Sequence, residues 1–573
     1  MCFNAGVSIS SQRSGRRRRA GWLVVAAIVV LVAGLVVVGA AVLVPLLAAT
    51  PGGASASPPP HYVEEASAAG VDQAYAGDFD YFVGGGVAVF DCDDDGLPDL
   101  YLPGGSDAAA LYRNESPVGG ALSFARQTDA ATDLDAVTGA YPLDIDSDGI
   151  VDLAVLRNGE NVLLRGIGDC RFERANEAWS FDGGSEWTTA FSATWEAGSS
   201  WPTLAIGNYH DADFTDPDQL CQPNELWRPA SGGGGYAASI PLTPSWCALS
   251  MLFSDWDHSG QRDLRVSNDH HYYSDASDGE EQLWRMTAGQ PPHLYTRDEG
   301  WQMLRIWGMG IASQDLDGDG RPEIFLSNQA DNMLQTLVAG ATGPEYRDIA
   351  RTSGATAHQP YGGSDTRNST AWHAQFEDVN NDGLMDLFVA KGNVDAMPEF
   401  AADDPSNLLI GQPDGTFVEG AEAAGIMDFA KGRGGAVVDL NLDGLLDIVE
   451  VKRRENIRLW RNVGAGDASR AAPMGHWAAI RLEQPAPDQA AIGAWLSVKV
   501  GERVIERELT IGGGHAGGQL GWTHIGLGAA DGAEVRVEWP DGEVGPWMPL
   551  PADAFSIIER GATEVRPWTP AGR

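Results

Sequence analysis

At 573 residues the chain is long enough for two or more domains, and its 43% hydrophobic content is ordinary for a globular protein. The formal net charge of −42 at pH 7 excludes a surface built for nucleic acid, because phosphates need basic partners. The 71 glycines and 32 prolines favour turn-rich β-structure over a helix bundle.

The first 60 residues have the pattern of a membrane anchor. A basic tail (1–20) ends in the run Arg16 to Arg19, and the uncharged stretch 21–49 is long enough, at roughly 1.5 Å per residue, to cross a bilayer as one helix. The arginines predict a cytoplasmic tail, and 50–60 is a Pro/Ser linker. We therefore expect a single-pass membrane protein with a cytoplasmic N-terminus and a periplasmic or extracellular bulk, unless the anchor is cleaved near Ala54.

A loop of the form DxDxDGxxD recurs six times beyond the linker. The carboxylates at positions 1, 3, 5 and 9 converge on one point only if the backbone curls, which the glycine at position 6 permits. Such a cluster needs a hard cation, and Ca²⁺ fits best because it accepts several carboxylates in a flexible shell. The expected metal ligands are Asp91, Asp93, Asp95 and Asp99; Asp144, Asp146, Asp148 and Asp152; Asp255, Asp257, Ser259 and Asp263; Asp315, Asp317, Asp319 and Glu323; Asp378, Asn380, Asp382 and Asp386; and Asp439, Asn441, Asp443 and Asp447.

The spacing of the loops predicts the architecture. Most steps between first aspartates are about 60 residues, and one is about twice as long. The segment Ala193 to Asn208 fills that gap as a seventh repeat without acidic ligands, in which Trp195 and Trp201 are expected to fill the hairpin. Short apolar runs flank the loops, as in four-stranded blades, whereas the position-12 glutamate and helices of an EF-hand are missing. We predict a seven-bladed β-propeller over 61–463.

Four cysteines follow the linker, and an even number on the outer side of a membrane favours disulfides. Cys221 and Cys247 bracket an insertion in the third repeat, so we expect them to pair. For Cys92 and Cys170, both a second disulfide and two buried free thiols remain open. None of the spacings resembles a CxxC zinc or redox motif.

The C-terminal part alternates apolar and polar residues, for example at Leu496, Val498 and Val500. This period-2 pattern, interrupted by Gly and Pro, predicts a small antiparallel β-sandwich over 474–567. The complete fold-class prediction is an all-β chain, a seven-bladed β-propeller followed by a small β-sandwich, with one N-terminal transmembrane helix.

These motifs resemble the FG-GAP/VCBS integrin-like propellers, and more closely the cartilage acidic protein type with a C-terminal ASPIC/UnbV domain. The first likeness is carried by residues 84–96 (GGGVAVFDCDDDG), 346–354 (YRDIARTSG) and 417–425 (FVEGAEAAG). The second is carried by residues 491–494 (AIGA), 512–515 (GGGH) and 524–528 (HIGLG). The resemblance implies that each loop holds calcium in a hairpin on one face of the propeller.

The sequence favours a binding module over an enzyme. It contains no GxSxG, P-loop or HExxH motif, and acidic pairs such as Asp403-Asp404 and Glu280-Glu281 are expected to be solvated turns. We expect a membrane-anchored, extracytoplasmic, calcium-binding propeller that acts in adhesion or as a scaffold for a protein or glycan at the cell surface or in the envelope. The alternative is a polysaccharide-degrading enzyme that uses the propeller face near His270, His271 and Trp372.

Overall fold

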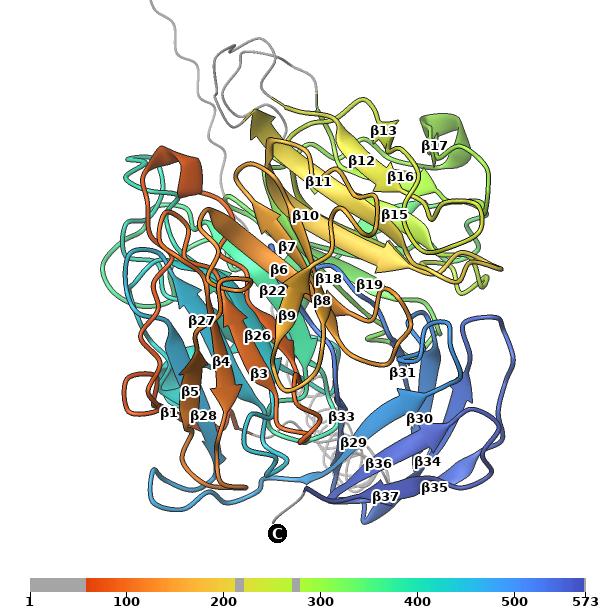
Figure 1. Cartoon of the computed structure of the whole chain (residues 1–573). Helices are drawn as coiled ribbons and strands as arrows, with labels where there is room; N and C mark the ends of the chain where they lie inside the picture. Colours follow the sequence, from red (N-terminus) through yellow and green to blue (C-terminus); the bar gives the residue numbers. More distant parts are fainter. Residues whose placement is uncertain (1–57, 212–220, 270–278, 571–573) are drawn as a thin grey trace, which may run out of the picture. The chain divides into compact units, whose positions relative to one another are not determined.

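The computed structural model describes residues 58–211, 221–269 and 279–570, and the regular secondary structure of this part of the chain is almost entirely β-strand (Figure 1). The predicted all-β class is therefore confirmed. Helical segments are single turns, namely η1 (Phe79–Tyr81), η2 (Arg297–Glu299), α2 (Ala350–Ser353) and α3 (Ala421–Ala424).

Seven sheets of four antiparallel strands follow one another along residues 58–464, which we call the repeat region. Sheets 1 to 3 contain β2 (Ala88–Phe90), β3 (Asp99–Leu102), β4 (Ala110–Asn114) and β5 (Phe124–Gln127); β6 (Val137–Leu143), β7 (Asp152–Arg157), β8 (Val162–Gly166) and β9 (Phe172–Arg174); and β10 (Glu186–Thr194), β11 (Thr203–Asp211), β12 (Asn224–Trp227) and β13 (Ile240–Leu242). Sheets 4 to 6 contain β14 (Ala248–Ser254), β15 (Asp263–Asn268), β16 (Gln282–Arg285) and β17 (His293–Leu294); β18 (Gly308–Gln314), β19 (Glu323–Asn328), β20 (Met333–Leu337) and β21 (Tyr346–Asp348); and β22 (Ala371–Glu377), β23 (Asp386–Lys391), β24 (Asn407–Gly411) and β25 (Phe417–Glu419).

Sheet 7 is assembled from both ends of the repeat region. Its strands β26 (Gly432–Val438), β27 (Asp447–Lys452) and β28 (Arg458–Gly464) are completed by β1 (His61–Glu64), which pairs antiparallel with β28. The first strand of each sheet contacts that of the next from β2 to β26. Val89 of sheet 1 and Ala436 of sheet 7 share one apolar cluster, so the row of sheets closes on itself.

The C-terminal region, residues 474–570, forms two further four-stranded sheets. Between them lies one apolar core that contains Ile480, Leu496, Val498, Val535 and Trp539, with Val500 packed against it. Leu496, Val498 and Val500 are the residues in which the period-2 pattern is seen. The strands are β33 (Thr523–Gly528), β29 (His476–Glu483), β36 (Ala554–Glu559) and β37 (Arg566–Trp568) in one sheet, and β31 (Arg503–Glu508), β30 (Trp495–Val500), β34 (Gly532–Glu538) and β35 (Met548–Pro551) in the other.

A loop of the C-terminal region enters the ring of first strands. This insertion loop, residues 510–520, joins β31 to β33 and includes β32 (Gly518–Gln519), which pairs parallel with β2 of sheet 1. Further bridges join Gly517 to sheet 2, Ile511 to sheet 3, Gly512 to sheet 4 and Gly514 to sheet 5. The insertion loop therefore forms β-bridges with the first strands of five sheets.

Glycines on the first strands make room for this loop. A Cβ atom added at Gly139 of β6 would lie 1.8 Å from the Ala516 carbonyl oxygen, and one added at Gly86 would lie 2.0 Å from the Ala516 carbonyl carbon. His515 at the tip is fully buried, accepts the Gly84 N–H at Nε2 (3.1 Å), and its own N–H donates to His373 (3.3 Å). The insertion loop thus fits closely into the channel, which is the space that the ring of first strands surrounds.

The predicted localisation as a single-pass membrane protein with a cytoplasmic N-terminus needs correction. In the part of the chain that the structure describes, no helix has the length and apolar character required to cross a membrane. The predicted tail, spanning helix and most of the linker (1–57) lie outside the described residues.

Candidate metal centres in the first hairpin of each sheet

Each predicted loop connects the first and second strands of its sheet, and the same hydrogen bonds shape all six. The N–H of the glycine at position 6 donates to the carboxylate at position 1, at 2.8 Å for Gly96 and Asp91 and 2.6–3.0 Å in the other five. Position 4 adopts a left-handed conformation throughout, with φ between +54° and +78°, although only one of its six residues is glycine. The backbone of each of the six loops therefore curls as the motif requires.

Position 9 has a structural role that the motif does not reveal. Asp152 accepts the Ile145 N–H (2.7 Å) from its own loop and the Gly166 N–H (2.8 Å) from β8. Five loops share the bond from position 2, and the third loop instead has Trp256 Nε1 donating to Asp263 (3.0 Å). This carboxylate thus fixes the loop to its own sheet.

The structure brings three acidic side chains together in three of the loops. Carboxylate oxygens of positions 1, 3 and 9 lie within 4.8 Å of one another in the trios Asp91, Asp93 and Asp99; Asp144, Asp146 and Asp152; and Asp315, Asp317 and Glu323. Among the described residues, the acidic side chains of the loops at Asp255, Asp378 and Asp439 form no such trio.

In the three loops with a trio, the carboxylate at position 5 is not part of the cluster. Asp95, Asp148 and Asp319 each accept the backbone N–H two residues further on, at 2.8–2.9 Å. Their role in the described structure is to support the turn.

The trios carry more negative charge than their surroundings compensate. Burial, with a smaller contribution from neighbouring aspartates, raises the pKa of Asp91 and Asp144 to about 6 and that of Asp152 to about 8. Asp93 Oδ1 and Asp146 Oδ1 are buried and have no hydrogen-bond partner among the described residues. Oxygen donors of this kind fit a hard divalent cation.

In the hairpin of sheet 3, an arginine side chain pairs with an acidic residue where the other sheets have a candidate metal loop. Arg228 Nε donates to Glu196 Oε1 (2.6 Å), and Thr203 Oγ1 donates to the same oxygen (3.1 Å). Trp201 is buried against Trp179, with ring centroids 5.3 Å apart. An arginine and apolar packing thus stabilise this hairpin.

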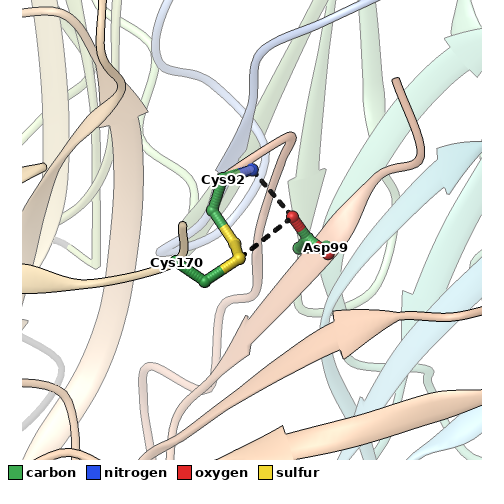
Figure 2. Close-up of side chains that lie close together, drawn as sticks. All are labelled: Cys92, Asp99 and Cys170. Carbon is green, nitrogen blue, oxygen red and sulfur yellow. Dashed lines mark hydrogen bonds between the residues drawn. A yellow bond between two sulfur atoms is a disulfide. The ribbon is translucent and has the colours of Figure 1, made fainter. Parts of the chain in front are cut away.

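The described residues contain two disulfides. Cys221 bonds to Cys247, and Cys92 bonds to Cys170. Cys92 is position 2 of the first loop, and Cys170 lies in the β8–β9 turn of sheet 2, so the second bond links two sheets. Figure 2 shows that Asp99 lies against this bond, where it accepts the Cys92 N–H at 2.7 Å.

Other sequence candidates are buried or lie outside the described residues. Trp372 is fully buried, donates to the Gly392 carbonyl (2.7 Å) and stacks on Arg433, while His270 and His271 lie outside. The expectation of solvated turns is wrong for Asp404 and Glu281, which are each 1% exposed. Asp404 forms a 2.8 Å ion pair with the equally buried Lys391, a long-range contact with no local sequence signal.

A cavity of about 970 Å³ lies between the repeat region and the C-terminal region. Its wall combines loop residues such as Asp93 and Asp94 with Arg481, Gln519 and Trp522. The Arg481 guanidinium lies 5.1 Å from the Trp522 ring centroid. The cavity thus offers charged, amide and aromatic groups together.

Comparisons with known proteins agree with these two regions. The FG-GAP-like repeat model matches residues 91–155, 315–389 and 378–450, and the ASPIC and UnbV model matches residues 484–565. Cartilage acidic protein 1 of Mus musculus is 23% identical over 252 residues, which cover 43% of this chain and 37% of the mouse protein. The matched part therefore spans little more than a third of that relative.

Two solved structures have low overall similarity. An Agrocybe aegerita lectin that recognises non-reducing terminal N-acetylglucosamine is 16% identical, with a TM-score of 0.36, and the match covers 64% of this chain and 88% of the lectin. Saccharomyces cerevisiae Sqt1 is 9% identical, with a TM-score of 0.35, and the match covers 71% of this chain and 99% of Sqt1. The family models confirm the resemblance in the sequence: the chain contains FG-GAP-like repeats and an ASPIC and UnbV domain.

Proposed function

We propose that the chain is an extracytoplasmic, calcium-binding, seven-bladed β-propeller (61–463) with a small β-sandwich (474–567), and that it acts as a binding or scaffold module for a protein or glycan partner. The seven consecutive four-stranded sheets and the pairing of β1 with β28 support the blade count. The single core between the two C-terminal sheets supports the sandwich.

The acidic trios carry the calcium part of the proposal. Three carboxylates within 4.8 Å of one another, partly buried and with unpartnered oxygens, suit an ion that takes several oxygen ligands. All 24 ligand positions named from the sequence belong to the proposed sites, with the trios at Asp91, Asp144 and Asp315 as the best-formed. The ion would neutralise the mutual repulsion of these carboxylates.

The disulfides support an extracytoplasmic location. Disulfides form and persist in oxidising compartments and are rare in the cytosol. Both bonds lie in the repeat region, and one of them fixes the first candidate metal loop to the next sheet.

The cavity is the proposed partner site, and its chemistry favours a glycan. A volume of about 970 Å³ is at the upper end of the usual range for small-ligand sites. Sugar rings stack on aromatic side chains, and their hydroxyl groups pair with groups such as the amide of Gln519 and the guanidinium of Arg481. A protein partner would need a surface outside the cavity.

Two measurements test the proposal. The melting temperature should rise by many degrees from chelator to millimolar calcium, since each site contributes about 2.7 kcal/mol at a hundredfold excess over its Kd. An unchanged melting temperature would refute the calcium part. A glycan array probed with calcium-loaded protein should give signals that are lost in the Trp522→Ala variant. The signals should persist in Trp547→Ala, which removes an exposed tryptophan of the same region. If the array gives no signal and the protein instead captures envelope proteins, the partner is a protein and not a glycan.

A further inference from the structure

The C-terminal region contacts every one of the six candidate metal loops or the residue just before it. Hydrogen bonds run from Gln489 to the Ser147 carbonyl (3.1 Å), from the Asp255 N–H to Glu508 (3.0 Å), from Gln314 to the Glu506 carbonyl (2.7 Å) and from the Gly528 N–H to the Asn381 carbonyl (3.0 Å). In the first and last loops the position-6 glycine faces a tryptophan. A Cβ atom added at Gly96 would lie 2.2 Å from the Trp568 ring, and one added at Gly444 would lie 1.9 Å from the Trp477 ring.

Many of these contacts fall on position 4, where the loop backbone is strained. Non-glycine residues with positive φ cost of order 1 kcal/mol or more and persist only where the surroundings hold them. Ser147 (φ +62°) and Asn381 (φ +58°) each accept a bond from the C-terminal region at their carbonyl. His258 (φ +55°) stacks on Trp495 at 4.3 Å between ring centroids.

An ion would hold the same curl from its other side. In the three loops with a trio, the carboxylates at positions 1, 3 and 9 converge on one point. Position 4 contacts the C-terminal region in the second, third and fifth loops. Without a cation the carboxylates repel one another, and the curl relaxes at its most strained residue. The surface that the C-terminal region contacts then changes first in the three loops that hold a trio.

We propose that metal loading of the six loops and docking of the C-terminal region are coupled, so that the ions act as a latch that keeps the insertion loop inside the ring of first strands. The proposal rests on the calcium part of the proposed function and is independent of the partner. Removal of the ions would release residues 510–520, open the channel and enlarge the cavity. The latch is reciprocal, because docking must strengthen metal binding by the same factor as metal binding strengthens docking.

Hydrogen exchange on the full chain tests the latch, with calorimetry as an independent measure of calcium binding. The Gly513 N–H bonds to the Met251 carbonyl (2.7 Å) and the Leu520 N–H to the Val89 carbonyl (2.9 Å), so both report on docking. From calcium to chelator, exchange in the insertion loop should accelerate by about 5- to 150-fold, the usual range of such coupling. Exchange in β30 and β34, which pair within the C-terminal region, should stay unchanged.

Each other outcome has a distinct meaning. Calcium binding by calorimetry with unchanged exchange in the insertion loop would overturn the latch and leave the calcium sites standing. Equal acceleration in β30 and β34 would overturn it in favour of unfolding of the whole region. Absence of calcium binding would overturn the calcium part of the proposed function and, with it, the latch.

A variant pair tests reciprocity without altering a proposed ligand. Arg262, at position 8 of the third loop and not a proposed ligand, donates from Nη2 to the carbonyls of Gly493 and Pro540 (3.1 Å for the second). Arg262→Ala should therefore lower calcium affinity severalfold and accelerate exchange in the insertion loop. Arg321→Ala is the matched control, since the Arg321 side chain makes no hydrogen bond to the described C-terminal residues. Equal calcium affinities for the two variants would contradict the coupling.

Discussion

Replacing Asp152 by alanine should destabilise the protein even when no metal is bound. The carboxylate is fully buried and accepts two backbone N–H groups, from Ile145 at 2.7 Å and from Gly166 at 2.8 Å. Alanine leaves both donors buried without a partner, at about 1–3 kcal/mol each, so the expected loss in chelator is about 2–6 kcal/mol. In calcium the loss should be larger, because a proposed ligand is also removed.

Asp146→Ala is the matched control, because it removes one carboxylate from the same trio. Asp146 accepts a bond only from the partly exposed Arg165 (2.7 Å), and such pairs contribute about 0–1 kcal/mol. In chelator this variant should have nearly the wild-type urea midpoint, measured by tryptophan fluorescence, while in calcium it should lose stability. Equal midpoints for the two variants in chelator would refute the structural role of position 9.

Three further predictions concern the channel and the buried charges. Gly139→Ala places a methyl group 1.8 Å from the Ala516 carbonyl oxygen, so it should cost about 1–3 kcal/mol and make the insertion loop sensitive to protease, and a normal protease pattern would contradict the close fit. Burial lowers the pKa of His515 to about 3, so between about pH 3 and 6.5 the folded state binds fewer protons than the unfolded chain. The urea midpoint should therefore fall as the pH drops through that window. His515→Asn should make this fall smaller. Lys391→Met should cost about 3–5 kcal/mol in urea unfolding because it leaves the charge of the buried Asp404 without its cation, and adding Asp404→Asn, which keeps an acceptor for Ser369 Oγ and the Thr370 N–H, should restore most of the loss.

The sequence allowed the repeat pattern to be predicted because its signals are local. A glycine three residues before the last ligand and apolar runs on both sides are enough to mark each of the six loops. The closing Gly-Asn pair marks the hairpin of sheet 3 even without acidic ligands. The structure shows how that hairpin is stabilised instead, by Arg228 on Glu196. Arg228 lies 32 residues away, so no local pattern connects the two.

Contacts between distant segments could not be predicted in the same way. The GGGH segment at Gly512 to His515 is visible in the sequence, but nothing there indicates that it enters the ring of first strands. Asp404 looks like a surface turn because it lies in the connection between β23 and β24, whereas its partner, Lys391, lies on β23. The position-4 strain is equally hidden, since Asp94, Ser147 and Leu442 share no side-chain chemistry, and only the backbone reveals the common conformation.

The pairing of β1 with β28 has a consequence for how the chain is synthesised. The two partners are about 400 residues apart, and at about 5–20 residues per second the second one emerges at least about 20 s after the first. Until then the edge of β1 has no strand beside it, and an unpaired edge is a template for pairing with other chains. The insertion loop emerges later still, so the channel stays open until the last part of the chain is made. Protection of the nascent chain during this interval is therefore a requirement of the topology itself.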